Sequence, residues 1–258
     1  MNATTTAHRS QGGTGVGHVS PMQPLRWIAR AWDDLTAMPG ASLRYGVVVT
    51  LGGWLIFAFG DHPFFVAAAV TVFLLVGPIL STGLCELSRR RSQDAYADFE
   101  SSLEALGRNR DGLLHFAGTL LAIGAVWTVL STLMLATMLG NAAPSVELAM
   151  WQDVFAMLSA EQLQAYTLVG GALAMLVFAL SVVTVPMLVD RGDMTAKTAM
   201  RQSVRVFFAN LPSMVVWAAS IALLTAIGFA TMLVAMILIF PLLGHASWHA
   251  YQDLAASR

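Results

Sequence analysis

Long apolar stretches separated by short polar segments limit what this chain can fold into more than any other feature. Most of the sequence between about residue 43 and residue 251 consists of such stretches. A stretch of about 20 predominantly apolar residues is long enough to cross the hydrocarbon core of a bilayer as an α-helix. The sequence therefore predicts an all-α, polytopic membrane protein.

Composition supports this class and excludes several others. Hydrophobic residues make up 57% of the chain and charged residues 11%, whereas a soluble domain carries about 25% charged residues. The formal net charge of −1 provides no overall field that would attract nucleic acid or an acidic substrate. The single cysteine, Cys85, excludes an internal disulfide, a multi-cysteine metal cluster and a two-cysteine copper centre.

Six membrane spans are predicted, with approximate boundaries at residues 43–60, 64–87, 113–139, 163–188, 213–229 and 232–251. Residues 1–22 contain no apolar segment of the kind found in a signal peptide, so we expect a disordered cytoplasmic tail there. Residues 23–258 would then form a single transmembrane helical domain.

An internal repeat organises these spans. Three amphipathic segments each precede a pair of spans, and the second span of each pair contains a proline followed by apolar residues: Pro78, Pro186 and Pro241. We interpret the chain as three units, each an interfacial helix on the cytoplasmic side followed by a membrane hairpin. The amphipathic segments align as Leu25/Tyr96/Lys197, Ile28/Phe99/Met200, Trp32/Leu103/Val204 and Leu35/Leu106/Phe207.

The repeat bears on an ambiguous stretch near the C-terminus. Residues 212–240 fit either one long span or the start of two short spans that turn near Gly228. The repeat favours two. Lys and Arg cluster in the loops that would face the cytoplasm, which places the N-terminus in the cytoplasm by the positive-inside rule. Six spans return the C-terminus to that side, and five would leave it outside.

The last stretch carries the most specific pattern, in which His245 and His249 share one helical face. Two neutral imidazoles on one face have the spacing to share copper or zinc, or to ligate haem. No other His, Cys or Met motif has the spacing to complete a ligand shell, so no metal or cofactor is predicted. The alternative is structural: with Pro241, Gly244, Trp248 and Tyr251 they would form a hydrogen-bonded aromatic helix end near the lipid headgroups.

Charged residues gather at the cytoplasmic ends of the spans. Glu86 and Arg89, and likewise Asp190 and Arg191, follow a proline, where a carboxylate would either pair with an arginine of another unit or remain solvated. Five basic residues in these loops are expected to contact anionic lipid headgroups: Arg90, Arg91, Lys197, Arg201 and Arg205.

Some functional signals are missing from the sequence. No Asp, Glu, Lys or Arg lies in a predicted bilayer core, although ion-coupled transporters usually keep such a residue on their pathway. The sequence also lacks a phosphate-binding glycine loop and a nucleophile with a neighbouring base. We therefore expect neither an enzyme nor a driven pump.

Three motifs occur in order: Gly77-Pro78-Ile-Leu-x-x-Gly83-x-x-Glu86-Leu-Ser-Arg89, Pro186-Met-Leu-x-Asp190-Arg191 and Pro241-Leu-Leu-Gly244-His245-Ala-x-Trp248-His249-x-Tyr251. They resemble an uncharacterised bacterial integral-membrane family, a domain of unknown function, some of whose members carry the label of cytochrome c oxidase subunits. The resemblance covers about residues 25–254, and Gly-His-Ala-x-Trp-His is its most specific part. The family usually has arginine after the tyrosine, where this chain has Gln252.

These observations favour a non-catalytic accessory or assembly subunit of a bacterial inner-membrane complex. The resemblance implies a haem-copper oxidase as the first partner to test. Two alternatives stay open: a haem- or copper-handling protein that uses His245 and His249, and a facilitator for a neutral or lipid-like solute, which broken helices would suit.

Overall fold

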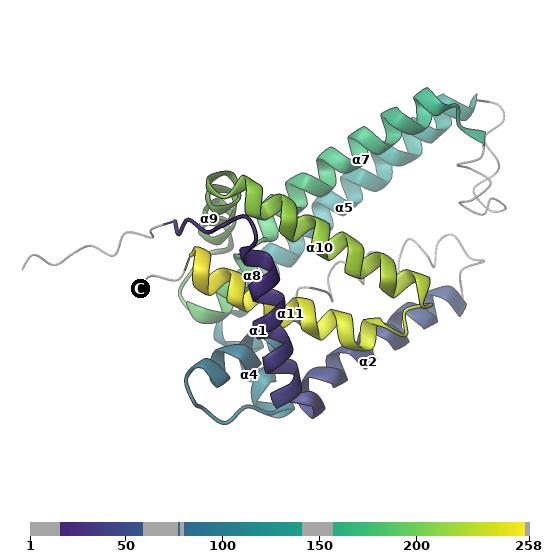
Figure 1. Ribbon diagram of the computed structural model, residues 1–258. Coiled ribbons are helices and arrows are strands. Elements are labelled where there is room, and N and C mark those ends of the chain that lie inside the picture. Colours follow the sequence, from purple (N-terminus) through teal and green to yellow (C-terminus); the bar gives the residue numbers. More distant parts are fainter. Residues whose placement is uncertain (1–15, 59–76, 78–79, 141–156, 256–258) are drawn as a thin grey trace, which may run out of the picture.

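The computed structural model describes residues 16–58, 77, 80–140 and 157–255 (Figure 1). The regular structure of this part is helical and contains no strand, so the predicted all-α class is confirmed. Besides a helical segment at residues 80–92, the helices are α1 (Gln23–Ala37), α2 (Pro39–Ala58), α4 (Phe99–Arg108), α5 (Arg110–Leu139), α7 (Ala160–Ser181), α8 (Thr184–Asp190), α9 (Ala196–Ala209), α10 (Leu211–Ala230) and α11 (Met236–Leu254).

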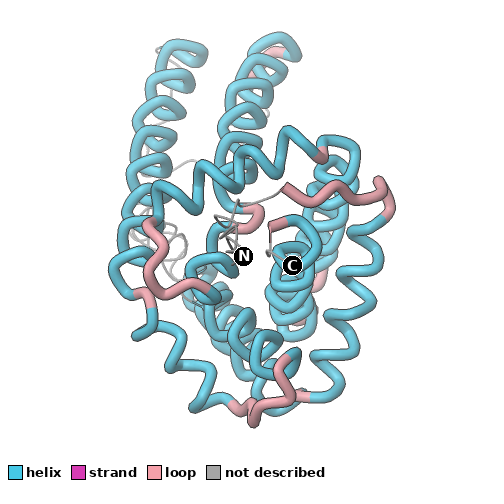
Figure 2. Tube along the Cα trace, turned by 90° about the vertical axis from the view of Figure 1, so that its left-hand side faces the viewer, coloured by secondary structure: helices cyan, strands magenta, loops and turns pink. Residues whose placement is uncertain are grey.

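The described helices form two regions, a cluster of packed helices and a pair of helices that projects from it. At one end of Figure 1, α1, α4, α8 and α9 gather around the 80–92 helix and residues 244–254 of α11, and we call this region the head. Residues 121–139 of α5 and 160–180 of α7 project from it side by side, and we call them the arm. Figure 2 views the molecule from the head side and shows helices and loops arranged as a ring.

Helix α11 is the element around which the described part is packed. It contacts α1, α2, α8 and α10. Close approach depends on glycine: a Cβ at Gly46 of α2 would lie 2.1 Å from the Ile237 carbonyl oxygen, and one at Gly244 would lie 2.5 Å from a Leu84 methyl carbon. Real Cβ atoms do not come so near, so both positions require glycine for this packing.

The three amphipathic segments predicted from the sequence are present as the helices α1, α4 and α9. Polar caps fix the starts of two of them: Asp98 and Ser101 form a capping box at α4, and the Thr195 hydroxyl accepts a hydrogen bond from the Thr198 N–H at α9. Their inward faces match the predicted apolar stripe only in part. Leu35 and Phe207 are buried as predicted, but Leu25, Trp32 and Leu103 are exposed. One position of each buried face holds a small residue that is 0% exposed: Ala31, Ser102 and Ser203.

Three helices are long and apolar enough to cross a membrane: Arg110–Leu139, Ala160–Asp190 and Leu211–Ala230. The six-span architecture is therefore not confirmed, although α2 and α11 lie close to the first and last predicted spans. The second predicted span, 64–87, falls largely on residues 59–76 and 78–79, which lie outside the described residues together with Pro78. The fourth is interrupted at residues 182–183, between α7 and α8.

The ambiguous stretch at residues 212–240 is not one continuous helix. Helix α10 ends at Ala230, residues 231–235 form a turn, and α11 begins at Met236. Met232 and Leu233 adopt positive φ angles of 52° and 67°, and the Leu233 N–H donates to the Gly228 carbonyl at 2.8 Å. The chain reverses slightly later than the predicted Gly228, which is buried against Met236.

Residues 16–22, assigned from the sequence to the tail, lie against the head. The Gly17 N–H donates to the Leu254 carbonyl at 2.9 Å, and the Val19 N–H donates to Asn210 Oδ1 at 3.0 Å. The Ser213 hydroxyl donates to the Ser20 carbonyl at 2.9 Å. The predicted tail is thus bound to the helices from residue 17 onward, a correction to its boundary, because α9, α10 and α11 satisfy its backbone groups.

Candidate functional site

The two predicted histidines lie in one buried polar network in the head. His245 is 0% exposed and lies between α2 and the 80–92 helix. Its Nε2 lies 2.9 Å from the Ser42 hydroxyl, and its Nδ1 lies 2.7 Å from the Ser88 hydroxyl. Ser42 and Ser88 are themselves buried, so each hydroxyl finds its partner inside the protein.

Asp34 of α1 joins the second histidine to the first. Ser88 donates to Asp34 Oδ2 at 2.5 Å, and His249 Nε2 lies 2.9 Å from the same oxygen. Arg91 forms an ion pair with Asp34 Oδ1 at 3.2 Å. We call Asp34, Ser42, Ser88, His245 and His249 the histidine network. It connects α1, α2, the 80–92 helix and α11.

The proton positions in this network follow from its partners. Burial raises the pKa of the Asp34 carboxyl, but hydrogen bonds from His249 and Ser88 outweigh that effect and hold its pKa below its usual value. An ionised Asp34 only accepts, so Ser88 uses its one proton on Asp34. His245 Nδ1 must then carry the proton donated to Ser88, and its Nε2 accepts from Ser42. The hydrogen bonds therefore run in one direction, from Ser42 to Asp34.

This geometry bears on the proposed metal or haem ligation. The ring nitrogens of His245 face Ser42 and Ser88, and those of His249 face Asp34 and, at 3.2 Å, Gln252. A metal ion needs a free imidazole lone pair, so it would have to displace one of these hydrogen bonds. Within the described residues no group of three His, Cys, Asp or Glu side chains could hold a metal ion. Ligation by the histidines stays an open alternative, which metal analysis and an optical spectrum would test.

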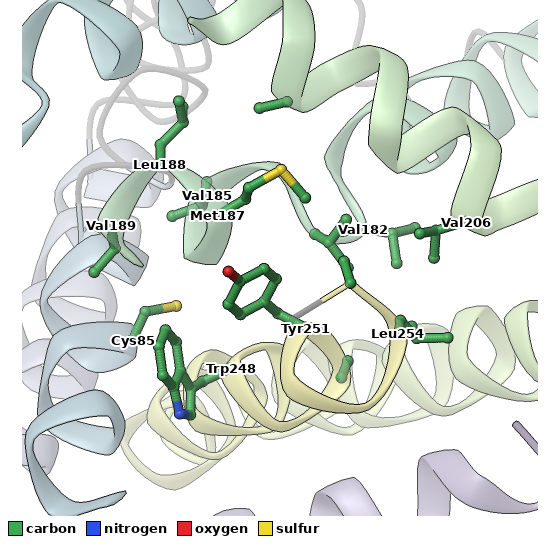
Figure 3. Close-up of a cluster of buried hydrophobic side chains, with 14 of the residues drawn as sticks. Cys85, Val182, Val185, Met187, Leu188, Val189, Val206, Trp248, Tyr251 and Leu254 are labelled. Carbon is green, nitrogen blue, oxygen red and sulfur yellow. The ribbon is translucent and has the colours of Figure 1, made fainter. Parts of the chain in front are cut away.

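Trp248 and Tyr251 lie in the core, not at an exposed helix end. They are 3% and 1% exposed, and their ring centroids are 5.4 Å apart. Figure 3 shows Tyr251 among side chains of α8, with Cys85 of the 80–92 helix nearby. The Tyr251 hydroxyl donates to Asp190 Oδ2 at 2.5 Å. These two aromatic residues therefore pack the C-terminal end of α11 against α8.

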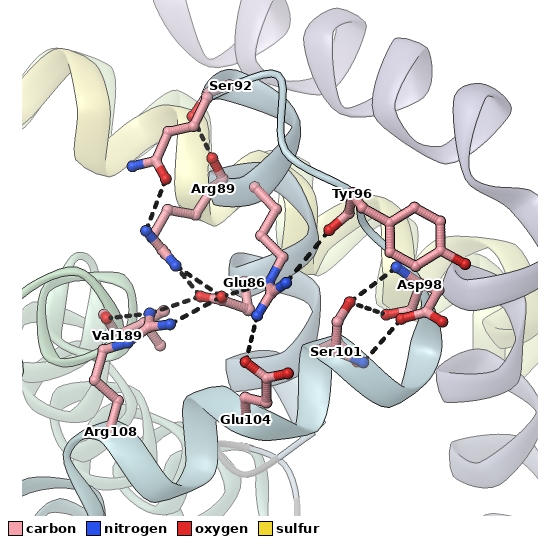
Figure 4. A network of polar contacts seen from close by, with 12 residues as sticks. Glu86, Arg89, Ser92, Tyr96, Asp98, Ser101, Glu104, Arg108 and Val189 are labelled. Atoms are coloured by element: carbon pink, nitrogen blue, oxygen red, sulfur yellow. Dashed lines mark hydrogen bonds and ion pairs between the residues drawn. The ribbon is translucent and has the colours of Figure 1, made fainter.

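A second polar cluster surrounds Glu86 (Figure 4), which is 0% exposed. Arg89 binds both of its carboxylate oxygens, at 2.7 and 2.8 Å, and Arg90 binds one at 2.8 Å. Arg108, at the end of α4, also binds both oxygens, at 2.8 and 3.0 Å, and donates to the Val189 carbonyl. The arrangement matches the predicted pairing of a span-end carboxylate with an arginine of another unit.

A third carboxylate, Asp253 near the end of α11, binds α1. Its Oδ2 accepts from Gln23, Trp27 and Arg30 at 2.8, 2.8 and 2.6 Å. Burial raises the pKa of Asp253, but these hydrogen bonds outweigh it and hold the pKa below its usual value. The end of α11 is also held by Arg191, which donates a hydrogen bond to the Ala255 carbonyl at 3.5 Å.

The predicted headgroup contacts divide into two sets. Arg90 is engaged by Glu86 and by Glu104, and Arg91 by Asp34 and the Asp33 carbonyl, so both serve contacts within the head. Lys197, Arg201 and Arg205 lie exposed along α9. The described part therefore leaves only this second set turned outward, available to lipid.

Sequence reasoning missed several members of these clusters, namely Asp34, Ser42, Ser88, Arg108 and Asp253. Asp34 and His249 are separated by 215 positions in the chain, so no local pattern connects them. The sequence offered no signal for Asp34, because the predicted apolar stripe of that helix placed it on the polar side.

Comparison with known proteins gives one match. A family model described as "Predicted integral membrane protein (DUF2189)" matches residues 65–190, just under half of the chain. The chain is similar to this family. The match and the three long apolar helices support membrane localisation. Comparison with curated proteins and with solved structures finds no match.

Proposed function

We propose that this protein is a non-catalytic accessory or assembly subunit of a larger bacterial inner-membrane complex, with a haem-copper oxidase as the first partner to test. The observation that carries the proposal is an exposed stripe along α5, most of it on the arm. The most apolar part of α5 is only 11% buried, compared with 50% for Ala160–Asp190. A helix in this state offers most of its surface to lipid or to another transmembrane helix.

The stripe has the spacing of a helix-packing face. It consists of residues at alternating steps of four and three, all of them exposed: Gly118, Ala122, Ala125, Val129, Thr132 and Ala136. Five of the six are small, and a Cβ at Gly118 would meet nothing within 4 Å. Small residues let two helix backbones approach closely in a membrane, where packing rather than hydrophobicity drives association. The occupant we propose is a transmembrane helix of the partner.

Polar contacts that link each of the three predicted units to the next would make the head a rigid scaffold. The three-unit interpretation itself is supported by residues of the same kind at matching positions of each unit. Counted from the aligned starts at residues 25, 96 and 197, the seventh residue of each unit is small and fully buried, as described above. The twenty-first is a buried aromatic residue in each unit: Tyr45, Phe116 and Trp217. Glu86 binds Arg108 of the second unit, Asp190 binds Tyr251 of the third, and Asp253 binds Arg30 of the first.

Helix α9 supports the cytoplasmic placement of the head. Its basic side chains Lys197, Arg201 and Arg205 are exposed, and so are Phe208 (64%) and Leu211 (43%) just beyond them. Apolar side chains beside a basic face are typical of a helix at the surface of an anionic leaflet. With the head on this side, the N-terminus lies in the cytoplasm.

The test is purification of the full chain from its native membrane in mild detergent, followed by native mass spectrometry. We expect a stoichiometric membrane-protein partner, and Ala125→Leu with Thr132→Leu should remove it by blocking the stripe. Ala219→Leu with Ala222→Leu on the exposed side of α10 is the matched control and should retain it. Absence of any stoichiometric partner with the unmodified protein would contradict the proposal.

A further inference from the structure

A cavity of about 170 Å³ lies between the 80–92 helix, α5, α7–α8 and α11. Its wall combines hydroxyl and thiol groups with apolar side chains: Ser81, Cys85, Phe116, Leu120, Ser181 and Ser247. The helices that supply the three serines belong to the second half of each predicted hairpin. The cavity thus lies where the three units meet, apart from the histidine network.

The serines retain accessible surface although their neighbours have almost none. Ser81, Ser181 and Ser247 are each partly exposed, whereas Thr82, Val182 and Ala246 beside them are 0%, 5% and 0% exposed. The Ser181 oxygen is itself buried and has no hydrogen-bond partner within the described part of the chain, so it is an unsatisfied polar atom in the wall of the cavity. Ser247 donates to the Leu243 carbonyl at 2.8 Å, which leaves its lone pairs free to accept.

The break between α7 and α8 lies beside the cavity, whose wall includes Ser181, Val185 and Pro186. Helix α7 ends at Ser181 and α8 begins at Thr184. Pro186, which lines the cavity, has no N–H, so the Val182 carbonyl four residues earlier lacks its helical donor. Interrupted helices that turn free backbone groups toward a cavity are a recurring way to build ligand sites in membrane proteins.

We propose that this cavity binds a small, neutral, hydrogen-bonding molecule of the size and chemistry of a short polyol or urea. Among the described residues no charged side chain lines it, so a bound ion would remain uncompensated. At about 30 Å³ for each water molecule, the volume accommodates about five or six non-hydrogen atoms. The Ser247 hydroxyl, and the Ser181 hydroxyl once its side chain rotates toward the cavity, satisfy the polar edge of such a ligand, and Phe116 and Leu120 cover its carbon skeleton. The inference goes beyond the scaffolding role and does not depend on it.

Saturation-transfer NMR on the full chain in lipid nanodiscs tests this, with glycerol and urea as neutral probes and choline and acetate as charged ones. We expect saturable transfer to at least one neutral probe and none to the charged probes. Ser181→Leu, which fills the cavity, should abolish the signal, and Ser181→Ala and Ser247→Ala should each weaken binding several-fold. Thr167→Leu, an equal change on the exposed side of α7, should leave it unchanged.

Three outcomes would overturn the proposal. These are no saturable transfer from either neutral probe, equal transfer from choline or acetate, or an undiminished signal in Ser181→Leu. If Ser181→Leu fails to fold, the two alanine variants decide, because they remove the hydroxyl without adding volume. Unchanged affinity in both would then overturn the proposal, because the probe would be bound without these hydroxyls.

Discussion

The head and the arm are stabilised by different kinds of contact. The head buries the carboxylates of Asp34 and Glu86 and holds each with cationic or hydroxyl partners from other helices. The described arm has one charged residue, Glu161, in the first turn of α7. Its two helices meet through the Ser131–Tyr166 hydrogen bond at 2.7 Å, the hydrogen bond from Gln162 to the Met138 carbonyl at 2.9 Å, and the packing of Trp127 against Tyr166 and Gly170.

The difference between the two regions follows from the surroundings of their side chains, which are lipid for the arm and the protein interior for the head. Apolar side chains gain little by associating in lipid, because lipid tails are as apolar as they are. The arm therefore needs few internal contacts and leaves much of its surface to other helices or lipid. The head buries charge, and its fold depends on every buried charge being matched. Substitutions in the head should therefore unfold it, whereas substitutions in the arm should change assembly.

Removing the carboxylate of Glu86 should have the largest effect. Glu86→Ala leaves three arginines facing each other around a buried site, and breaking a buried pair typically costs about 3–5 kcal/mol. Thermal and denaturant unfolding of the full chain in detergent measures the loss. Glu104→Ala is the matched control, because Glu104 binds the same Arg90 but is 65% exposed, where an ion pair contributes about 0–1 kcal/mol. Equal losses in the two variants would contradict the special role of the buried carboxylate.

Interrupting the histidine network should have the next largest effect. Ser88→Ala removes the hydroxyl between His245 and Asp34, so the His245 Nδ1–H loses its acceptor inside the protein. An unsatisfied buried donor costs about 1–3 kcal/mol. Amide hydrogen exchange in α1 and α11 should increase together. Ser92→Ala on the same helix removes an exposed hydroxyl that bonds only the Arg89 carbonyl, and it should leave exchange unchanged. A faster rate confined to the 80–92 helix would disprove the network.

Acid should weaken the head and leave the arm unaffected. The folded-state pKa values of Asp34 and Asp253 are lowered, so these carboxyls contribute stability above their unfolded pKa of about 3.9, and that stability is lost as the pH falls through the folded values. The free energy of unfolding should therefore decline below about pH 4. Asp253→Asn should make the decline shallower. Stability that rises on acidification would contradict this assignment.

The elements were more predictable than their contacts. Amphipathicity located α1, α4 and α9, because a helix at an interface repeats its apolar residues locally. It misjudged part of the inward face, because the large side chains Leu25 and Trp32 point outward and Ala31 points inward. The predicted number of crossings stays unconfirmed. Helix α11 shows why hydropathy alone does not decide it, since it combines an apolar start with the histidines and a buried polar end.

The histidine pair shows most clearly how much of the site could be predicted from the sequence. Spacing along α11 correctly placed His245 and His249 in one turn-to-turn column, but their partners lie on α1, α2 and the 80–92 helix. The spacing of residues along a helix shows which of them share a face, but it does not show which other helices pack against that face. The choice between ligation and structure therefore depends on distant hydroxyl and carboxylate groups.

The smallest expected effect is in the arm, at the hydrogen bond between Ser131 and Tyr166. A double-mutant cycle with Ser131→Ala and Tyr166→Phe should give a coupling energy of about 0.6 kcal/mol, the average for such bonds between membrane helices. Steric-trapping or detergent unfolding of the full chain measures it. Thr128→Ala is the control, because Thr128 bonds only the Gly124 carbonyl of its own helix and should show no coupling to Tyr166. A coupling as large as the Glu86 effect would mean that the arm, too, is fixed by polar contacts, and the contrast between the two regions would fail.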